Sequence, residues 1–297
     1  MSGDARAGLL LVDKPDGPTS HDIVDRVRRT LGLRRVGHTG TLDPFATGLL
    51  ILCVGWVTRL AEFLSGLPKR YRATLRLGVR TDTDDRTGRV RSRDGAWALL
   101  DRAAIEAALR ARAEIGVQRV PAFSARRRGG RRLYESARRG IEVETPVQSI
   151  RIHRITCLDV SGPDVTFEVD GSAGMYVRAL ARDVGEDLGV GAHLTALRRL
   201  EVGAFRVEDA LPPEALDDRS AVERAMRPPR DAVAHLPWVE LTPAELLRFA
   251  QGQPLDAPAE RAGPQAVAVG FEGRLVGIAA IDDGALRPQK VLPPARV

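Results

Sequence analysis

The sequence has little cysteine, since only Cys53 and Cys157 occur among its 297 residues. Both lie in apolar, strand-like segments, and neither belongs to a C-x-x-C pair or has a pair of histidines nearby. This scarcity argues against a disulfide-stabilised fold and a cysteine-ligated metal site, because each needs several cysteines at short spacings. We therefore predict that both side chains are buried free thiols.

Long hydrophobic runs are also absent, because no apolar segment approaches the roughly 18 residues of a membrane-spanning helix. The N-terminal segment lacks the basic start, the longer apolar stretch and the small-residue cleavage site of a secretory signal. These features predict a cytoplasmic protein with no membrane partner. The length predicts either one large domain or a large domain with a small one.

Acidic residues do not balance the basic ones. The chain has 45 Lys and Arg against 39 Asp and Glu, a formal net charge of +6, and the excess comes from arginine. Arginine pairs bidentately with phosphate and stacks on bases, so this excess favours a polyanionic partner such as nucleic acid. A GC-rich genome also raises arginine content, and composition leaves both explanations open.

Hydrophobic periodicity predicts strands and helices that do not alternate regularly. The first helix should have Ser20 as its N-cap and end at Gly32, because small polar residues cap helices and glycine terminates them. This mixture indicates an α+β fold with a large mixed or antiparallel sheet. Strands are expected near 8–13, 49–54, 70–77, 149–160 and 164–172, with further helices over 101–115 and 175–189.

Two segments interrupt these elements. Residues 119–140 carry eight arginines around a Gly-Gly pair, without the periodicity of a core element, which predicts an exposed excursion. Residues 224–237 are polar and rich in proline, and short strands follow them. We place a domain boundary near residue 231, which divides the chain into 1–230 and 231–297.

The segment GHTGTLDPFATGLL contains the strongest candidate for chemistry, Asp43. A carboxylate in a Gly-rich loop just before a buried strand would lie at the end of a sheet, where a substrate can reach it. The alternative is that Asp43 only forms a turn with Pro44. Spacing leaves both readings open.

Four blocks of sequence resemble, in order and spacing, the motifs of the TruB family of pseudouridine synthases. They are VDKPDGPTSHDIV, RRVGHTGTLDPFATGLLILCVG, KRYRATLRLGVRTDTDDRTG and SAGMYVRALARDVGEDLGVGAHLTALRRL, and together they cover nearly all of residues 8–205. The resemblance implies a pseudouridine synthase fold whose large sheet is mostly antiparallel, followed by a small β-rich, PUA-like RNA-binding domain. It also implies a monomer that converts uridine 55 in the T-loop of tRNA to pseudouridine, with no cofactor, metal or protein partner.

The resemblance also assigns catalytic residues. Asp43 matches the essential carboxylate, which acts as a nucleophile or removes a ribose proton to form a glycal, and the sequence does not distinguish these routes. Tyr71 matches the tyrosine that stacks on the target base and assists proton removal from C5. Arg178 matches the arginine that pairs with the catalytic aspartate, and pairing would hold Asp43 charged and oriented.

Further residues match positions that bind the RNA. Tyr176 and Leu197 match residues that line the base pocket, His38 matches a histidine that contacts the RNA, and Lys14 matches a supporting lysine near the floor of the site. The insertion of about 119–145 is expected to clamp the RNA with arginines as phosphate ligands, including Arg126, Arg127 and Arg131. The chain departs from the family pattern at Phe123, Arg126, Arg127 and Ala173, which puts individual RNA contacts in doubt but not the chemistry.

Alternatives remain at two levels. Asp82, Asp84 and Asp85 form an acidic cluster, but a calcium loop would need a central glycine and a distal glutamate at spacings that are missing. At the level of function, the chain could act on another RNA, as guide-directed relatives do, or could remodel tRNA without catalysis. The complete set of Asp43, Tyr71 and Arg178 argues against binding alone.

Overall fold

The computed structural model describes residues 7–124, 127–128, 131–132, 145–258 and 265–293. Its α-helices are α1 (Ser20–Leu31), α2 (Ala61–Ser65), α3 (Arg102–Ile115), α5 (Val177–Asp187), α6 (Arg219–Arg224) and α7 (Pro243–Ala250), and its 3-10 helices are η1 (Gly55–Leu60), η2 (Gly95–Leu99), η3 (Val207–Asp209), η4 (Pro213–Asp217) and η5 (Pro229–Val233). Its strands are β1 (Gly8–Lys14), β2 (Val36–His38), β3 (Thr47–Val54), β4 (Lys69–Leu77), β5 (Val79–Thr81), β6 (Val90–Arg93), β7 (Val117–Arg119), β8 (Arg127–Arg128), β9 (Arg131–Arg132), β10 (Val147–Ser149), β11 (Ile152–Ser161), β12 (Asp164–Gly171), β13 (Ala192–Val202), β14 (Phe205–Arg206), β15 (Trp238–Glu240), β16 (Leu255–Asp256), β17 (Gln265–Phe271), β18 (Arg274–Asp282) and β19 (Ala285–Val291).

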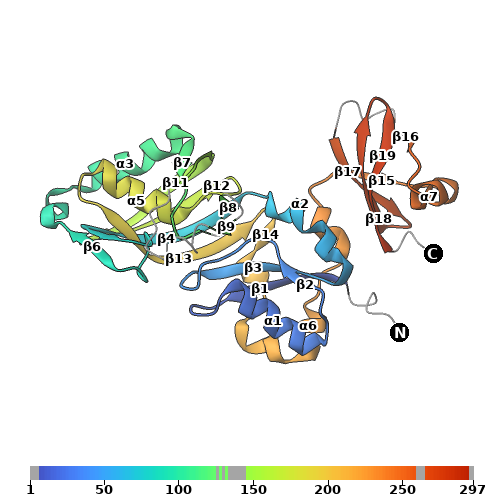
Figure 1. Cartoon of the computed structure of the whole chain (residues 1–297), viewed down its shortest axis with the longest axis horizontal. Helices are drawn as coiled ribbons and strands as arrows, with labels where there is room; N and C mark the ends of the chain where they lie inside the picture. Colours follow the sequence, from blue (N-terminus) through green and yellow to red (C-terminus); the bar gives the residue numbers. More distant parts are fainter. Residues whose placement is uncertain (1–6, 125–126, 129–130, 133–144, 259–264, 294–297) are drawn as a thin grey trace.

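The largest element is an eight-stranded sheet in the order β1-β3-β13-β4-β12-β11, with β2 beside β3 and β14 beside β13. Its described strands pair antiparallel except for a short parallel contact between β13 and β3. A separate five-stranded sheet, β15-β17-β18-β19-β16, follows in the C-terminal part of the chain (Figure 1). These observations confirm the predicted α+β class, the large and mostly antiparallel sheet and the β-rich C-terminal unit.

Strands β1 and β3 are buried on both faces. Leu9, Leu49 and Ile51 contribute to one apolar cluster, whereas Leu10 and Leu50 face the opposite way and pack against α1. Figure 1 shows α1 and α6 together on one side of these two strands. A strand covered on both faces has no polar alternation, which explains the continuous apolar run LLILCV.

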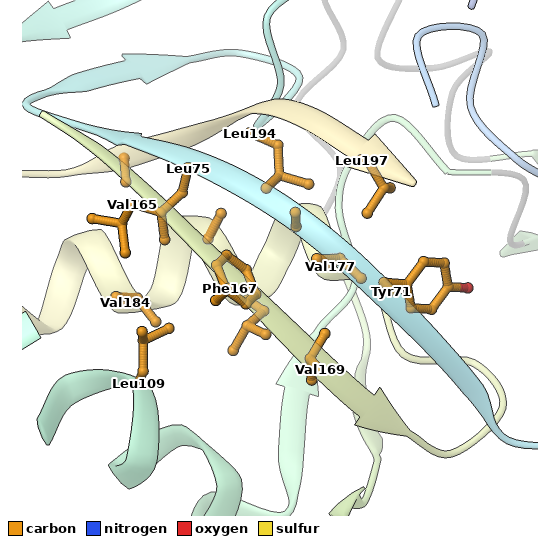
Figure 2. Close-up of a cluster of buried hydrophobic side chains, with 14 of the residues drawn as sticks. Tyr71, Leu75, Leu109, Val165, Phe167, Val169, Val177, Val184, Leu194 and Leu197 are labelled. Atoms are coloured by element: carbon orange, nitrogen blue, oxygen red, sulfur yellow. The ribbon is translucent and has the colours of Figure 1, made fainter. Parts of the chain in front are cut away.

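The other half of the sheet alternates, because only one of its faces is covered. On β4, Tyr71, Ala73 and Leu75 join a cluster with residues of α3 and α5, part of which is drawn in Figure 2. The intervening Arg70 and Arg72 point to the opposite face and pair there with carboxylates of neighbouring strands. The alternation of apolar and polar residues in KRYRATLRL therefore determines which face of the sheet the helices cover.

The start of α1 differs from the prediction. Its N-cap is Thr19, whose hydroxyl accepts from the N–H of Asp22 while the Asp22 carboxylate accepts from the Thr19 N–H. This reciprocal capping box outcompetes Ser20, which becomes the first residue of the helix and is buried. The other end is confirmed, since Gly32 adopts a left-handed conformation with φ of 65°.

The two cysteines are free, as predicted, but they differ in burial. Cys53 is buried in β3, whereas Cys157 lies in β11 at the edge of the sheet and is only half-buried. The prediction was wrong for the second thiol because β11 has a neighbour in the sheet on one side only, so its side chains reach solvent more readily.

The C-terminal unit has its own apolar core, built around Phe249, Val267 and Val276. It also packs against the large unit, because Ala268 and Ile278 belong to the cluster that contains Trp56 and Val233. The boundary near residue 231 falls inside η5 and stays a proposal, as does the PUA-like assignment. Within the described residues, none of the helices combines the length and the apolar character needed to cross a membrane.

Candidate active site

The loop between β2 and β3 carries Asp43 and is anchored from several sides. The Ser20 hydroxyl accepts from the Leu42 N–H at 2.8 Å and donates to the Leu42 carbonyl at 3.1 Å. The Pro44 carbonyl accepts from the Lys14 ammonium and from the Gly17 N–H. The loop is thus fixed on both sides of Asp43, which suits a group that must act from a defined position.

Arg199 of β13 braces the same loop from inside the protein. Only 1% of this residue is exposed, and its guanidinium donates to the Leu49 carbonyl at 2.7 Å and the Gly40 carbonyl at 3.0 Å. A Cβ on Gly48, whose φ is 99°, would lie 2.2 Å from the Arg199 carbonyl. Glycine is therefore required where β3 meets β13 and the two halves of the sheet join.

Asp43 and Arg178, 135 residues apart in the chain, form a bidentate ion pair. The Nε and Nη2 atoms of Arg178 donate to the two carboxylate oxygens of Asp43 at 2.8 and 3.1 Å. The arginine side chain is 4% exposed and the aspartate side chain 32% exposed. The pair thus has a buried cationic end and an accessible anionic end, so a carboxylate held in one orientation remains open to a substrate.

Arg178 has further partners that the sequence did not indicate. It donates to the carbonyls of Thr83 and Phe123 at 2.9 Å each, and the buried carboxylate of Asp85 lies 3.7 Å from its Nε. Asp85 in turn accepts hydrogen bonds from Thr83 and Thr87. The segment TDTDDRTG therefore supports Arg178. The sign of this role in the sequence was a run of aspartates, which lies in one of the blocks that resemble the family.

The described residues contain no group of three or more His, Cys, Asp or Glu side chains that could hold a metal ion. Within the acidic segment, Asp84 instead pairs with Arg182 of α5 at 3.2 Å. Asp85 points toward Arg178, and Asp82 accepts from the N–H of Arg89. The three aspartates that suggested a metal site therefore contact three different partners.

Tyr71 and Leu197 lie in the apolar cluster beside the Asp43 loop. Both belong to the cluster that also contains Leu42 and Phe45, the apolar neighbours of Asp43 in the chain. In Figure 2 the Tyr71 hydroxyl points away from the labelled aliphatic side chains. The structure therefore brings Tyr71, Leu197 and the Asp43 loop together, with the phenol at the margin of the apolar surface.

Tyr176 is the N-cap residue of α5 and lies two residues before Arg178. It is half-buried, and its backbone is held by the side chain of Gln118, which donates to the Tyr176 carbonyl and accepts from the Tyr176 N–H, both at 2.9 Å. The turn that carries Tyr176 is thereby connected to β7, the strand that leads into the arginine-rich excursion.

Lys14 and His38 lie near the loop but do not contact the Asp43 carboxylate by any hydrogen bond or ion pair within the described residues. Lys14 is fully buried and donates to the Pro15 and Pro44 carbonyls, and this burial lowers its pKa to about 8. Burial also lowers the pKa of His38, with a smaller effect of Arg199 in the same direction. The His38 Nδ1 atom is buried and finds no partner in the described part of the chain.

The remaining residues that were predicted to bind RNA are arginines of the excursion. Arg126 lies outside the described residues, and Arg127 and Arg131 lie on the short paired strands β8 and β9. Their proposed contacts with RNA stay predictions. The strands that flank the excursion, β7 and β10, pair antiparallel and are fully described.

Three family models match the chain in succession. TruB family pseudouridylate synthase (N terminal domain) matches residues 28–177, a tRNA pseudouridylate synthase B C-terminal domain matches 178–233, and a pseudouridine synthase II TruB C-terminal domain matches 237–292. The tRNA pseudouridine synthase B of Syntrophobacter fumaroxidans is 44% identical over 286 residues, which are 92% of each chain. The protein of the same name from Burkholderia lata is 45% identical, over 96% of this chain and 90% of its own. The chain belongs to the TruB family of pseudouridylate synthases.

Solved structures agree with this family. The structure entitled H/ACA RNP bound to a substrate RNA containing 2'-deoxyuridine has a chain that superimposes with a TM-score of 0.74 at 25% identity, over 97% of this chain and 86% of that one. A Cbf5-Nop10-Gar1 complex gives a TM-score of 0.74 at 26% identity, over 96% and 84%. As a TruB family member, the chain is an enzyme that isomerises uridine to pseudouridine.

In a TruB family member, the phenol of Tyr71 should contribute to the rate more than to stability. If Tyr71 assists proton removal from C5, as the family resemblance implies, Tyr71→Phe should lower the single-turnover rate of isomerisation roughly 100-fold. The free energy of unfolding should change by less than about 1 kcal/mol, because the ring keeps its packing in the apolar cluster. Rapid-quench kinetics and urea unfolding measure the two effects, and a variant as fast as the wild type would contradict the role.

Asp84 should give this TruB family member a pH-dependent stability. Burial raises its pKa from 3.8 to about 6, so the folded protein binds this proton more tightly than the unfolded chain does. The contribution of Asp84 to the free energy of unfolding therefore rises as the pH falls from about 6 to 3.8. The complete rise is on the order of 2 to 3 kcal/mol. Asp84→Asn, which tolerates the φ of 61°, should lack this contribution.

The comparison is made by urea unfolding of the wild type and Asp84→Asn at pH 7, 6 and 5. The difference between their free energies of unfolding should move in favour of the wild type as the pH falls. A difference that stays constant over this range would show that the Asp84 pKa is not raised.

Proposed function

We propose that the chain converts uridine 55 in the T-loop of tRNA to pseudouridine and that Asp43 is its catalytic carboxylate. The observation that carries the proposal is the bidentate pair of Asp43 with the buried Arg178, which leaves the carboxylate oriented and accessible. Two relatives of the chain, at 44% and 45% identity, are named tRNA pseudouridine synthase B, which supports tRNA as the substrate. Neither a cofactor nor an energy source is needed, because the isomerisation is redox-neutral and intramolecular.

The reaction breaks the bond between N1 and C1′, turns the base and joins C5 to C1′. A uridine in a stacked loop hides this bond, so the base must be extruded before it reacts. Asp43 then attacks the nucleotide or removes a ribose proton, and both routes need a carboxylate held in one orientation, which the two hydrogen bonds from Arg178 provide. Tyr71 and Leu197 would contact the extruded base, and Tyr71 would assist loss of the C5 proton.

A second candidate is isomerisation of a different RNA. It is favoured by the solved structures at 25–26% identity, whose titles describe an H/ACA RNP with substrate RNA and a Cbf5-Nop10-Gar1 complex. The greater identity to proteins named for tRNA favours tRNA. A role in tRNA folding without catalysis would use the same surface but would leave the arrangement of Asp43, Arg178 and Asp85 without a purpose.

The position of the product tests the proposal. An unmodified tRNA transcript is treated with the enzyme, labelled with a carbodiimide that stays on pseudouridine, and copied by reverse transcriptase. The proposal expects a single new stop next to position 55, absent when uridine 55 is replaced by cytidine. Stops elsewhere would identify another target, and no stop with tRNA bound would indicate a binding role.

A further inference from the structure

The excursion of residues 119–145 leaves the large unit through a two-stranded neck. Strands β7 and β10 pair antiparallel, and Gln118 and Gln148 are direct partners in their register. Both glutamine side chains reach the turn that precedes α5, where Gln118 bonds to Tyr176 and Gln148 donates to the Gly174 carbonyl at 2.7 Å. The neck therefore contacts the turn through two neighbouring carboxamides.

Gln118 bonds both backbone groups of Tyr176: it accepts from the N–H, and it donates to the carbonyl, which also accepts from the Leu180 N–H of α5. Its carboxamide presents a donor and an acceptor side by side, as a peptide group in a neighbouring strand would, and Gln118 is 3% exposed. Tyr176 precedes the helix, so its N–H has no partner inside α5. A buried carboxamide is the side chain that meets both needs, since a carboxylate accepts but does not donate and an aliphatic chain does neither.

The chain leaving β7 is also joined to α5 by two arginines of that helix. Arg182 donates to the carbonyl of Arg119, the last residue of β7, at 3.0 Å, and Arg178 donates to the carbonyl of Phe123, four residues further on, at 2.9 Å. Arg178 uses the same Nη2 atom to bond Asp43 and Phe123. The orientation of the guanidinium toward Asp43 is therefore tied to the segment that follows β7.

We infer that Gln118 is a positioning residue, which fixes the backbone at Tyr176 so that the first turn of α5 presents Arg178 to Asp43 and Tyr176 to the substrate. The inference rests on the proposed function. Gln118 itself touches neither Asp43 nor Arg178 in the contacts above, and its effect passes through the turn. Gln148 supports the same turn through its bond to the Gly174 carbonyl, from a more exposed side chain.

The test compares Gln118→Met, Gln118→Glu, Gln148→Met and the wild type by single-turnover kinetics at saturating tRNA. Gln118→Met keeps the volume and removes both hydrogen bonds, and it should lower the saturated rate roughly 10- to 100-fold, as a displacement of about 1 Å does. Gln148→Met should lower it less. The Kd for tRNA should change little, because Gln118 is buried. The urea midpoint should fall modestly, because the Tyr176 backbone loses a buried partner, but the variant should stay fully folded under the assay conditions. Thr74→Val, which removes a hydrogen bond on the opposite face of the sheet, is the control.

Gln118→Glu adds a second measurement, the pH dependence of the rate, which distinguishes a positioning role from a purely structural one. The introduced carboxylate accepts from the Tyr176 N–H but faces the Tyr176 carbonyl, and its protonated form can donate again. A carboxyl in this buried place should have a raised pKa, so the rate relative to wild type should recover as the pH falls from 8 to 6.

Two results would overturn the inference while leaving the enzyme's function intact. One is a Gln118→Met variant with the saturated rate of the wild type. The other is a variant whose lower rate is fully explained by a raised Kd or by partial unfolding. A wild type that binds the tRNA but does not isomerise it would overturn the proposed function and, with it, the positioning role.

Discussion

Asp43→Asn should reduce the single-turnover rate of isomerisation by roughly 10⁴-fold or more, because the amide is neither a nucleophile nor a base at neutral pH. The variant should still bind tRNA at least as well as the wild type, since a negative charge near a polyanion has been removed. Rapid-quench kinetics with saturating enzyme give the rate, and filter binding gives the Kd.

A matched control is available on the same side of the loop. Asp16 is an exposed carboxylate one residue before Gly17, whose N–H bonds the Pro44 carbonyl. Asp16→Asn removes the same charge and breaks an exposed ion pair with Arg86, but it leaves the pair of Asp43 with Arg178 intact, so its rate should stay within about twofold of the wild type. Equal losses in the two variants would mean that charge near the loop, and not the Asp43 carboxylate, accounts for the effect.

Arg178→Lys should also slow isomerisation, although it keeps the charge. The guanidinium bonds Asp43 at two atoms and two backbone carbonyls at the same time, whereas an ammonium on a flexible stem cannot reproduce this fork. We expect a rate reduction of roughly 10²- to 10³-fold from loss of the preorganised orientation of Asp43. The single-turnover rate at saturating tRNA measures it.

A double substitution separates this catalytic effect from a structural one. Arg178→Met leaves Asp85, whose side chain is 5% exposed, as a buried carboxylate without its cation and should cost about 3 to 5 kcal/mol of stability. Adding Asp85→Asn should restore much of that stability, because the uncompensated charge is gone. The rate should stay low in the double variant, and recovery of the rate together with stability would contradict a direct role of Arg178.

The sequence predicted features that depend on local pattern. The alternation in β4 and the continuous apolar run of β3 are local patterns, and they agree with the one-sided burial of β4 and the two-sided burial of β3. Asp43 was a candidate because it lies in a Gly-rich loop before a buried strand, but this pattern left a simple turn with Pro44 open, and the family resemblance assigned its role. The family resemblance then added Arg178, which the structure shows paired with it.

Other features depend on contacts between distant segments, which no local pattern specifies. Arg199 has the sequence context of an ordinary residue of β13, and only the structure shows that it bonds the Gly40 carbonyl in the Asp43 loop and the Leu49 carbonyl in β3. Gln118 directly precedes the arginine-rich stretch, and no local pattern in the sequence indicates its contact with Tyr176. Ser20 was assigned as a cap because it is small and polar, but its hydroxyl bonds to Leu42, 22 residues away.

The most direct test of the central claim is tritium release from a tRNA transcript labelled at C5 of its uridines, which measures isomerisation as it replaces the C5 hydrogen. The account predicts release equivalent to one uridine per tRNA by the wild type. It predicts none by Asp43→Ala despite equal binding, and none from a transcript that lacks the uridine at position 55. Wild-type enzyme that binds the transcript yet releases no tritium, or Asp43→Ala that releases it at the normal rate, would contradict the account.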